Sequence, residues 1–527
     1  MGSAPRGRGA RAVSRRGVLS GLAGAAALIS VVTVVSRLLG FVRTLVFTGS
    51  VGVATVGDAY IWANTLPNVL FEVAAGGALA GALIPVIAGP LARGMRDDVS
   101  RIASAMLGWT LAGLVLLAAL LVALAEPLAG LARVGESGSG HDLVVFLIRV
   151  FAVQLPFYGL AVVLSGVLQA QRKFFWPAFA PVLSSLVVIG TYLGYGRVLA
   201  AARVDAATPD VGALPDGAAG LLAWGTTAGV VAMSVPLLVP VWRSGVRLRP
   251  GLRFPPGVAA RARSLALAGI GGLVAQQLAV LATLQLSTRY GGDGALSAYQ
   301  QMVQPVYLLP YAVLAVPLAT STFPRLAARA AAPDRAGYAP LAALTTRAVL
   351  VAGGVGAAML AAVAPAATAV LQSVGKGDSE LIGSVAVAQT LIAPGLLGMG
   401  LIFHVSRALY ALERGRLAVL AASSGWLTVV VASWVACAVL VPGAPDGPAT
   451  LRALAIGNSV GMLVAGAALV AVLRAAAGAD AVRGLGRTLL VLVVAGSGAG
   501  LLGRWTVDAV QAVAHGLPGA LAAAAGG

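Results

Sequence analysis

The sequence predicts an all-α, polytopic membrane protein. Of its 527 residues 59% are hydrophobic and only 10% are charged, which leaves too little polar surface for a water-soluble globule. Apolar runs long enough to cross a bilayer recur along nearly the whole chain, and basic residues collect in alternate connections between them. We therefore expect 13–14 transmembrane helices, arranged as two parallel-related six-helix lobes around a central cavity.

The apolar runs define the expected helices. A helix needs about 20 residues to cross the hydrocarbon core of a bilayer. Thirteen runs meet this length, at 22–48, 57–89, 103–125, 143–168, 177–197, 217–241, 264–288, 297–323, 342–372, 382–410, 417–441, 452–473 and 486–503. The tail 505–527 either begins a fourteenth helix or forms a short surface segment.

The positive charges are distributed unevenly between the connections. Of 36 Lys and Arg residues, 25 lie in seven segments, at 1–20, 92–102, 169–177, 242–264, 324–347, 411–418 and 474–488. The alternate connections hold only seven, which is the positive-inside pattern and predicts a cytoplasmic N-terminus. The net charge of +18 therefore reflects membrane topology, and no nucleic-acid partner is expected.

The single cysteine, Cys437, lies in an apolar span, so no disulfide framework or metal cluster is expected.

The chain also repeats itself. Pro85 and Pro324 lie in similar segments 239 residues apart, and Ser165 and Ser406 lie in similar segments 241 residues apart. Each copy holds six spans, an even number, so both copies have the same orientation in the membrane. The expected division is a basic cytoplasmic tail (1–20), a first lobe (21–257), a second lobe (258–475) and a C-terminal region (476–527) with the thirteenth span and any fourteenth. Parallel repeats of this kind are typical of transporters with a site between two lobes.

Two arginines inside the first apolar run are the strongest functional signal. Arg37 and Arg43 each cost about 2.5–3.5 kcal/mol at bilayer depth on insertion scales, so we expect them to have a function. Two guanidinium groups suit a pyrophosphate, because each can bind two oxygens at once. In a helix the two lie about 600° apart, so one cavity takes both only if the helix bends, which Gly40 permits, or if they lie at different depths. Alternatively, one arginine pairs with Asp58 or Glu72 and locks two helices together.

Polar residues in the second span extend this site. Asp58 stands where the span begins and is expected either to cap the helix or to compensate an arginine charge when the outer gate is closed. Glu72 lies deeper and suits a cation site or a structural pair. Asn64 and Asn68 flank Pro67, a pattern that indicates a kinked helix with polar groups facing a cavity.

The repeat predicts which residues of the second lobe face these arginines. A shift of 239 residues places Gln276 opposite Arg37, with Gln277 beside it. The second lobe is therefore expected to offer amide donors where the first offers guanidinium groups.

Several segments resemble the MurJ (MviN) family of lipid II flippases. The first two spans carry SRLLGFVR at 36–43, DAY at 58–60, LPN at 66–68, GGAL at 76–79 and PV at 85–86. Later matches are RKF at 172–174, PAFAP at 177–181 and RALYAL at 407–412. The resemblance covers residues 22–503, nearly the whole chain.

The resemblance implies a member of the multidrug, oligosaccharidyl-lipid and polysaccharide exporter superfamily in the bacterial plasma membrane. Its substrate would be the undecaprenyl-pyrophosphate-linked peptidoglycan precursor, moved from the inner to the outer leaflet by alternating access. The resemblance further implies that Arg37, Arg43 and Asp58 belong to the cavity and its gate, and it makes cell-wall synthesis and division proteins candidate partners. Two departures stand out: where relatives carry further cavity arginines, this chain has Phe71 and Pro305.

The same residues bear on other possible functions. A flippase for another polyprenyl-pyrophosphate-linked saccharide would need the same arginines, whereas a drug or cation antiporter of this superfamily should have an acidic cavity. An enzyme is not expected, because the chain has no HExxH or phosphate-loop pattern. We therefore expect a transporter with no cofactor, driven by the membrane potential or a monovalent ion.

Overall fold

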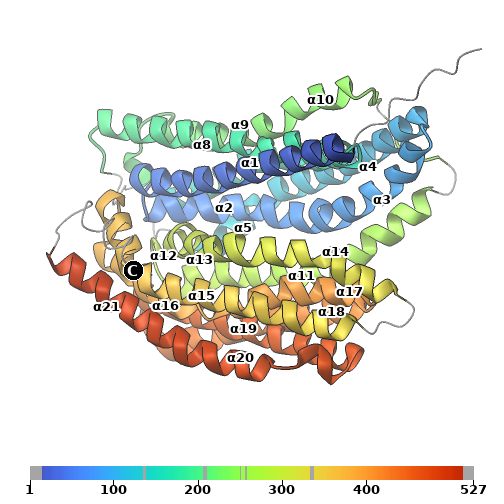
Figure 1. Cartoon of the computed structure of the whole chain (residues 1–527). Helices are drawn as coiled ribbons and strands as arrows, with labels where there is room; N and C mark the ends of the chain where they lie inside the picture. The colour runs from blue at the N-terminus through green and yellow to red at the C-terminus, as the bar shows by residue number, and fades with distance from the viewer. Residues whose placement is uncertain are drawn as a thin grey trace, which may run out of the picture.

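The computed structural model describes residues 15–134, 138–205, 211–249, 251–255, 258–332 and 337–513. Within these residues the chain is helical, and strand pairing is limited to one isolated bridge between Val53 and Gly377. The helices run roughly parallel to one long direction of the molecule (Figure 1). Residues 1–14 of the expected basic tail lie outside the described residues, and 15–20 already belong to the first helix.

The first lobe contains the helices expected before residue 257. They are α1 (Arg15–Ser50), α2 (Thr55–Phe71), the π-helix η1 (Glu72–Gly77), α3 (Ala78–Ala92), α4 (Arg96–Ala123), α5 (Ala125–Ala132), α6 (Gly138–Ala152), α7 (Gln154–Ala170), α8 (Phe175–Ala201), η2 (Val211–Ala213), α9 (Ala218–Ser234), η3 (Val235–Leu237) and α10 (Leu238–Arg243).

The second lobe repeats this order. Its helices are α11 (Val258–Tyr290), α12 (Ala295–Ala298), η4 (Tyr299–Val303), α13 (Gln304–Pro310), η5 (Tyr311–Ala315), α14 (Val316–Ala331), α15 (Tyr338–Val374), α16 (Ser379–Ile392), α17 (Gly395–Ala411), α18 (Gly415–Leu440) and α19 (Gly447–Ala477). The C-terminal region adds η6 (Ala479–Val482), α20 (Leu485–Val491), η7 (Leu492–Gly496) and α21 (Ser497–Val513).

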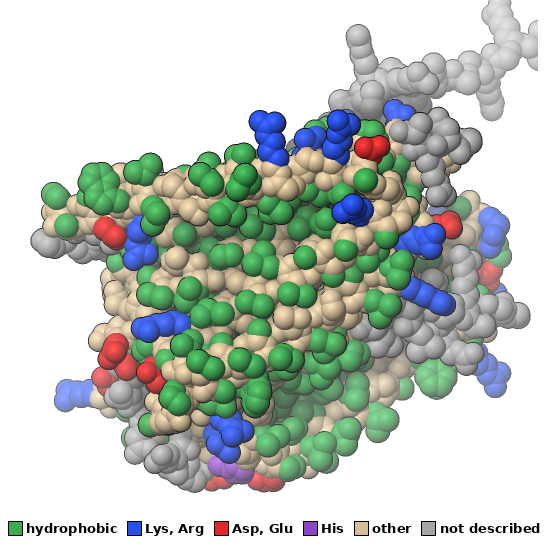
Figure 2. Space-filling model, turned by 90° about the horizontal axis from the view of Figure 1, so that it is seen from below, with side chains coloured by type: hydrophobic (Ala, Val, Ile, Leu, Met, Phe, Trp, Pro, Cys, Tyr) green, Lys and Arg blue, Asp and Glu red, His purple; other side chains and the backbone are tan. Residues whose placement is uncertain are grey.

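Helices occupy all thirteen of the expected spans, which confirms the predicted fold class. Among the described residues, nine helices are long and apolar enough to cross a membrane, or ten if the pair α16 and α17, bent by 51°, forms one span. The remaining expected spans coincide with α1, with α2 to α3, and with α11. Hydrophobic side chains are spread over the broad face in Figure 2, and its charged side chains lie mainly toward the edges.

The repeat predicted from the sequence is present in the backbone. A π-helix begins at Glu72 in one lobe and another begins at Tyr311 in the other, 239 residues later. Arg172 and Glu413 follow α7 and α17 with the same left-handed φ of 61°, and they lie 241 residues apart. The two lobes therefore share these two local irregularities of the backbone.

The two ends of the bundle differ in charge. The basic segments that follow α3, α7, α10, α14, α17 and α19 share one end, on the right in Figure 1, which we call the basic end. At the opposite end the lobes are joined by backbone hydrogen bonds: Lys376 donates to Thr48 at 3.0 Å, and Val53 donates to Lys376 at 2.7 Å. Gly377 permits this junction, because its φ is 143° and a Cβ there would lie 2.4 Å from the Val53 carbonyl oxygen.

The interior of the first lobe contains a cluster of aromatic side chains. The Tyr60 hydroxyl is 2.8 Å from that of Tyr192 and 3.1 Å from that of Thr226. The Tyr60 ring also meets Phe151 and Phe47 at centroid distances of 5.5 and 5.6 Å. Because each buried hydroxyl has a partner, the cluster packs tightly and holds α2 against α6, α8 and α9.

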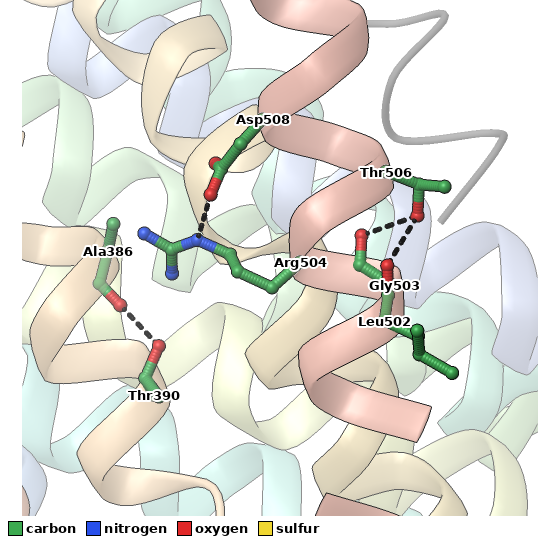
Figure 3. Close-up of polar contacts among 7 residues, drawn as sticks. All are labelled: Ala386, Thr390, Leu502, Gly503, Arg504, Thr506 and Asp508. Carbon is green, nitrogen blue, oxygen red and sulfur yellow. Dashed lines mark hydrogen bonds and ion pairs between the residues drawn. The ribbon is translucent and has the colours of Figure 1, made fainter. Parts of the chain in front are cut away.

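The last span is longer than expected. The helix does not end at 503, because α20, η7 and α21 continue to Val513, and only 514–527 of the expected tail lie outside the described residues. Polar groups near its C-terminal end are paired within the helix: the Arg504 Nε donates to Asp508 at 3.2 Å, and the Thr506 hydroxyl donates to backbone carbonyls one turn earlier (Figure 3). Such internal pairing lets charged residues remain in an apolar helix.

Candidate functional site

A cavity of about 800 Å³ lies between the two lobes. Helices α1, α2, α7, α8 and α9 contribute one side of its wall, and η4, α13 and η5 contribute the other. Its polar lining residues are Ser36, Arg37, Arg43, Thr44, Asn64, Thr65, Asn68, Tyr158, Ser184, Ser185, Gln300, Gln301 and Gln304.

Arg37 and Arg43 both line this cavity. Helix α1 is uninterrupted between them, and six residues advance about 9 Å along a helix axis, so the guanidinium groups enter the cavity at different depths. Gly40, between them, also lines the cavity, and a Cβ added there would meet nothing within 4 Å. One cavity therefore takes both arginines at different depths, without a break in the helix.

These two arginines are the only charged residues among the described residues that line the cavity. Ion pairs among the described residues involve Arg101, His141, Arg149 and Arg504, and none involves Arg37 or Arg43. The alternative that one of them locks to Asp58 or Glu72 is therefore not formed within the described part of the chain. The cavity presents two unneutralised positive charges, which favour an anionic ligand.

Asp58 caps a helix, but not its own. Its Oδ1 accepts from the Ser297 backbone N–H at 2.7 Å, and its Oδ2 accepts from the Gly294 N–H at 2.8 Å. Both donors belong to the start of α12 in the second lobe, whereas α2 itself begins after Ala54 without a side-chain cap. The expectation that Asp58 caps its own span is corrected: the carboxylate, 1% exposed, binds the lobes together at the opposite end.

Glu72, Phe71 and Pro305 differ in their position relative to the cavity. Glu72 is exposed at the start of η1 and does not line the cavity. Phe71 stacks on Tyr158 with ring centroids 4.9 Å apart, which places Phe71 beside a lining residue. Pro305 lines the cavity directly. Neither Phe71 nor Pro305 brings a charge, so the positive charge of the cavity comes from α1.

The asparagines of the second span line the cavity as expected from their positions. The Asn68 Nδ2 donates to the Asn64 carbonyl oxygen at 2.9 Å, and the Thr65 hydroxyl donates to Ile61 at 2.7 Å. The Asn64 Oδ1 is buried and has no hydrogen-bond partner among the described residues. It is therefore an acceptor that a hydroxyl or N–H of a ligand can satisfy.

The glutamines of the second lobe that line the cavity are not those expected. Gln276 and Gln277 lie on α11, which packs against α3 and α18, and neither lines the cavity. Gln300, Gln301 and Gln304 line it instead, from η4 and α13. The available signal was three amides within five positions of an apolar span, at 300–304.

No group of three or more His, Cys, Asp or Glu side chains that could hold a metal ion occurs among the described residues. The buried His404 ring is instead 3.0 Å from the Thr345 hydroxyl.

Comparison with known families shows to which family the chain belongs. The family model described as lipid II flippase MurJ matches residues 48–516. The chain belongs to the MurJ family. This family consists of transporters, in agreement with the predicted absence of catalysis. The matched range begins after the segment 36–43, so the case for Arg37 and Arg43 rests on the geometry of the cavity.

Individual relatives of the MurJ family are distant. The probable lipid II flippase MurJ of Rhizobium tropici is 28% identical over 302 residues, which are 56% of this chain and 53% of that protein. The lipid II flippase MurJ of Burkholderia cenocepacia is 28% identical over 395 residues, which are 72% of this chain and 71% of that protein. The match to the first of these relatives thus spans about half of its length.

Solved structures of related transporters have a similar fold to this chain. A lipid II flippase MurJ in an inward closed conformation superposes with a TM-score of 0.69 at 18% identity, covering 91% of this chain and 97% of that chain. An inward-facing multidrug resistance MATE family transporter of the MOP superfamily gives a TM-score of 0.63 at 15% identity, covering 83% and 95%. At these identities the likeness concerns the fold alone.

Proposed function

We propose that this protein flips lipid II, the undecaprenyl-pyrophosphate-linked peptidoglycan precursor, from the inner to the outer leaflet of the bacterial plasma membrane. Its N-terminus and basic end would face the cytoplasm, in keeping with the positive-inside pattern. The observation that carries the proposal is the cavity between the lobes, whose only charges among the described lining residues are Arg37 and Arg43.

The arginines would bind the pyrophosphate of the substrate. Each guanidinium group can hold two phosphate oxygens, and two groups at different depths match a diphosphate better than a single phosphate. Amides and hydroxyls on the facing walls, such as Asn64, Asn68 and Gln301, can bind the sugar and peptide groups. The lipid tail would remain in the bilayer. A cation antiporter is disfavoured, because no carboxylate lines the cavity within the described residues.

The junction at the opposite end would act as the outer gate. Asp58 and the pairing of Val53 with Lys376 close that end in this conformation. In alternating access these bonds break when the cavity opens outward and re-form when it empties. A charge-assisted hydrogen bond contributes about 1.5–3 kcal/mol, so the gate is strong enough to hold and weak enough to open.

We propose the membrane potential or a monovalent ion as the energy source, because the chain has no phosphate-loop motif for nucleotides. A cytoplasm-negative potential pulls positive charge inward, and about 2.3 kcal/mol per charge per 100 mV would favour return of the empty, arginine-lined cavity. Cell-wall synthesis and division proteins are the proposed partners.

Depletion of the protein in its host tests the activity. Lipid II accessible at the outer leaflet should fall on depletion and recover when the wild-type gene is supplied. If accessible lipid II stays constant while another polyprenyl-pyrophosphate-linked saccharide accumulates on the inner leaflet, the substrate is that saccharide and the proposal is wrong.

A further inference from the structure

A second cavity, of about 760 Å³, lies outside the lobe interface. It is formed at the basic end by α15, η6, α20 and the first residue of η7. It shares no lining residue with the cavity between the lobes. The charged residues that line it are Arg347, Asp480, Arg483 and Arg487.

These charges leave the second cavity positive. Three arginines against one aspartate give a formal charge of +2, from 3 − 1. No ion pair within 4.0 Å joins Asp480 to any of the arginines in the described part of the chain. Guanidinium groups that line one cavity without an ion-pair partner repel one another, so the cavity favours an anion.

Arg347 is held with its guanidinium group toward the cavity. Its Nε donates to the Ala343 carbonyl oxygen at 3.3 Å, on its own helix. The opposite wall is Gly484, with a φ of 80°, where a Cβ would lie 3.0 Å from the Arg347 Nη1. A glycine at this turn therefore leaves the space that the guanidinium group fills.

The other wall of the second cavity is apolar and continues onto the membrane-facing surface. Val351, Val491 and Leu492 line it, and Val491 is followed along the same span by the exposed Val493 and Val494. Helix α15 has 37 residues and is about 55 Å long, well beyond the hydrocarbon thickness of about 30 Å. Arg347, the tenth residue of α15, therefore falls near the headgroup level.

We propose that the second cavity binds the headgroup of an anionic phospholipid. The phosphate would lie among Arg347, Arg483 and Arg487, and the acyl chains would lie along α20 and η7. Basic pockets between membrane helices on one side of the bilayer are suited to such headgroups. Free phosphate shares the anionic chemistry but would leave the apolar wall uncovered.

The ligand would fasten the last span to the second lobe. The most apolar part of the span Ala479–Val510 is only 11% buried, against 22% to 61% for the other described spans. A lipid bound between α15 and α20 adds contacts that the protein alone lacks. This role goes beyond lipid II transport, since it concerns a site that the substrate cavity does not touch.

Native mass spectrometry of the full-length protein, with phosphatidylglycerol titrated in, tests the proposal. The variant Arg347→Gln, Arg483→Gln, Arg487→Gln should bind phosphatidylglycerol on the order of 100-fold more weakly, at about fivefold per arginine. A matched control removes three exposed arginines of the basic end that do not line the cavity, by Arg414→Gln, Arg416→Gln and Arg474→Gln. This control should bind like the wild type.

A variant that is expected to gain affinity controls for the possibility that the triple variant binds weakly because it misfolds. Asp480→Asn removes the one acidic residue among the described residues that line the second cavity, and it should tighten phosphatidylglycerol binding by about fivefold. Equal binding of phosphatidylcholine, unchanged binding in both cavity variants, or full displacement of the lipid by equimolar inorganic phosphate would each overturn the proposal. The last result would identify a phosphate site instead of a lipid site.

Discussion

Asp58 and Ser297 occupy equivalent positions in the two repeats, 239 residues apart, and they are hydrogen bonded to each other across the lobe interface at 2.7 Å. One copy of the repeat supplies a carboxylate, and the other supplies the helix start that the carboxylate caps. The contact therefore joins equivalent positions of the two repeats. The proposed outer gate is thus built from residues that the duplication relates to each other.

Asp58→Asn should weaken this gate. An asparagine has one side-chain oxygen, so one of the two backbone donors at Gly294 and Ser297 would face an NH₂ group instead of an acceptor. Loss of one charge-assisted bond shifts the closed state by about tenfold or more. A membrane-impermeant thiol reagent added at the outer side should then label Thr44→Cys in the cavity faster.

The labelling experiment has a clean background, because the only cysteine of the chain, Cys437, is buried. Labelling at an unchanged rate would show that Asp58 does not hold the cavity closed.

Gly377→Ala should destabilise the same end by another route. The added Cβ would lie 2.4 Å from the Val53 carbonyl oxygen, in a backbone conformation that L-residues rarely adopt. We expect a loss of about 1–3 kcal/mol in stability of the closed state, measured as a lower Tm of the purified protein. Gly443→Ala, where a Cβ meets nothing within 4 Å, is the matched control and should leave the Tm unchanged.

Gln301→Glu should lower the affinity for lipid II, whereas Gln276→Glu should not. Both changes replace an amide by a carboxylate, but only Gln301 lines the cavity with the arginines. A negative charge there opposes the pyrophosphate and neutralises a guanidinium group, which we expect to weaken binding by about tenfold. Equal losses in both variants would contradict the assignment of η4 to the cavity wall.

Arg43→Lys should restore only part of the activity that Arg43→Ala loses. Lysine keeps the positive charge but cannot bind two phosphate oxygens in one plane. Complementation of a strain depleted of its own flippase, with membrane insertion checked by immunoblot, measures the difference. Full rescue by lysine would mean that charge alone matters and that the two-pronged contact does not.

The spans and the repeat could be predicted from the sequence, because the length of an apolar run and the offset between similar segments are read directly from it. The sequence was also sufficient to single out Arg37 and Arg43, since charge in an apolar run is unusual wherever the helix lies. The partners of Asp58 could not be predicted, because Gly294 and Ser297 are more than 230 residues away and meet it only through docking of the lobes.

The prediction that Gln276 and Gln277 line the cavity was wrong for a related reason. The repeat equates α1 with α11, but α11 packs against α3 and α18, and η4 and α13 occupy the cavity wall facing α1. Sequence equivalence therefore does not guarantee an equivalent environment when the lobes dock asymmetrically.

Reconstituted transport can show whether Arg37 and Arg43 bind the substrate during flipping. Fluorescent lipid II would be flipped in proteoliposomes under an imposed potential, comparing the wild type, Arg37→Ala with Arg43→Ala, and the control Arg414→Gln with Arg416→Gln. We expect the cavity variant to lose flipping and the control to retain it, with both proteins correctly inserted. Flipping by the cavity variant at the wild-type rate would mean that neither arginine is needed for substrate binding and would leave both with a structural role.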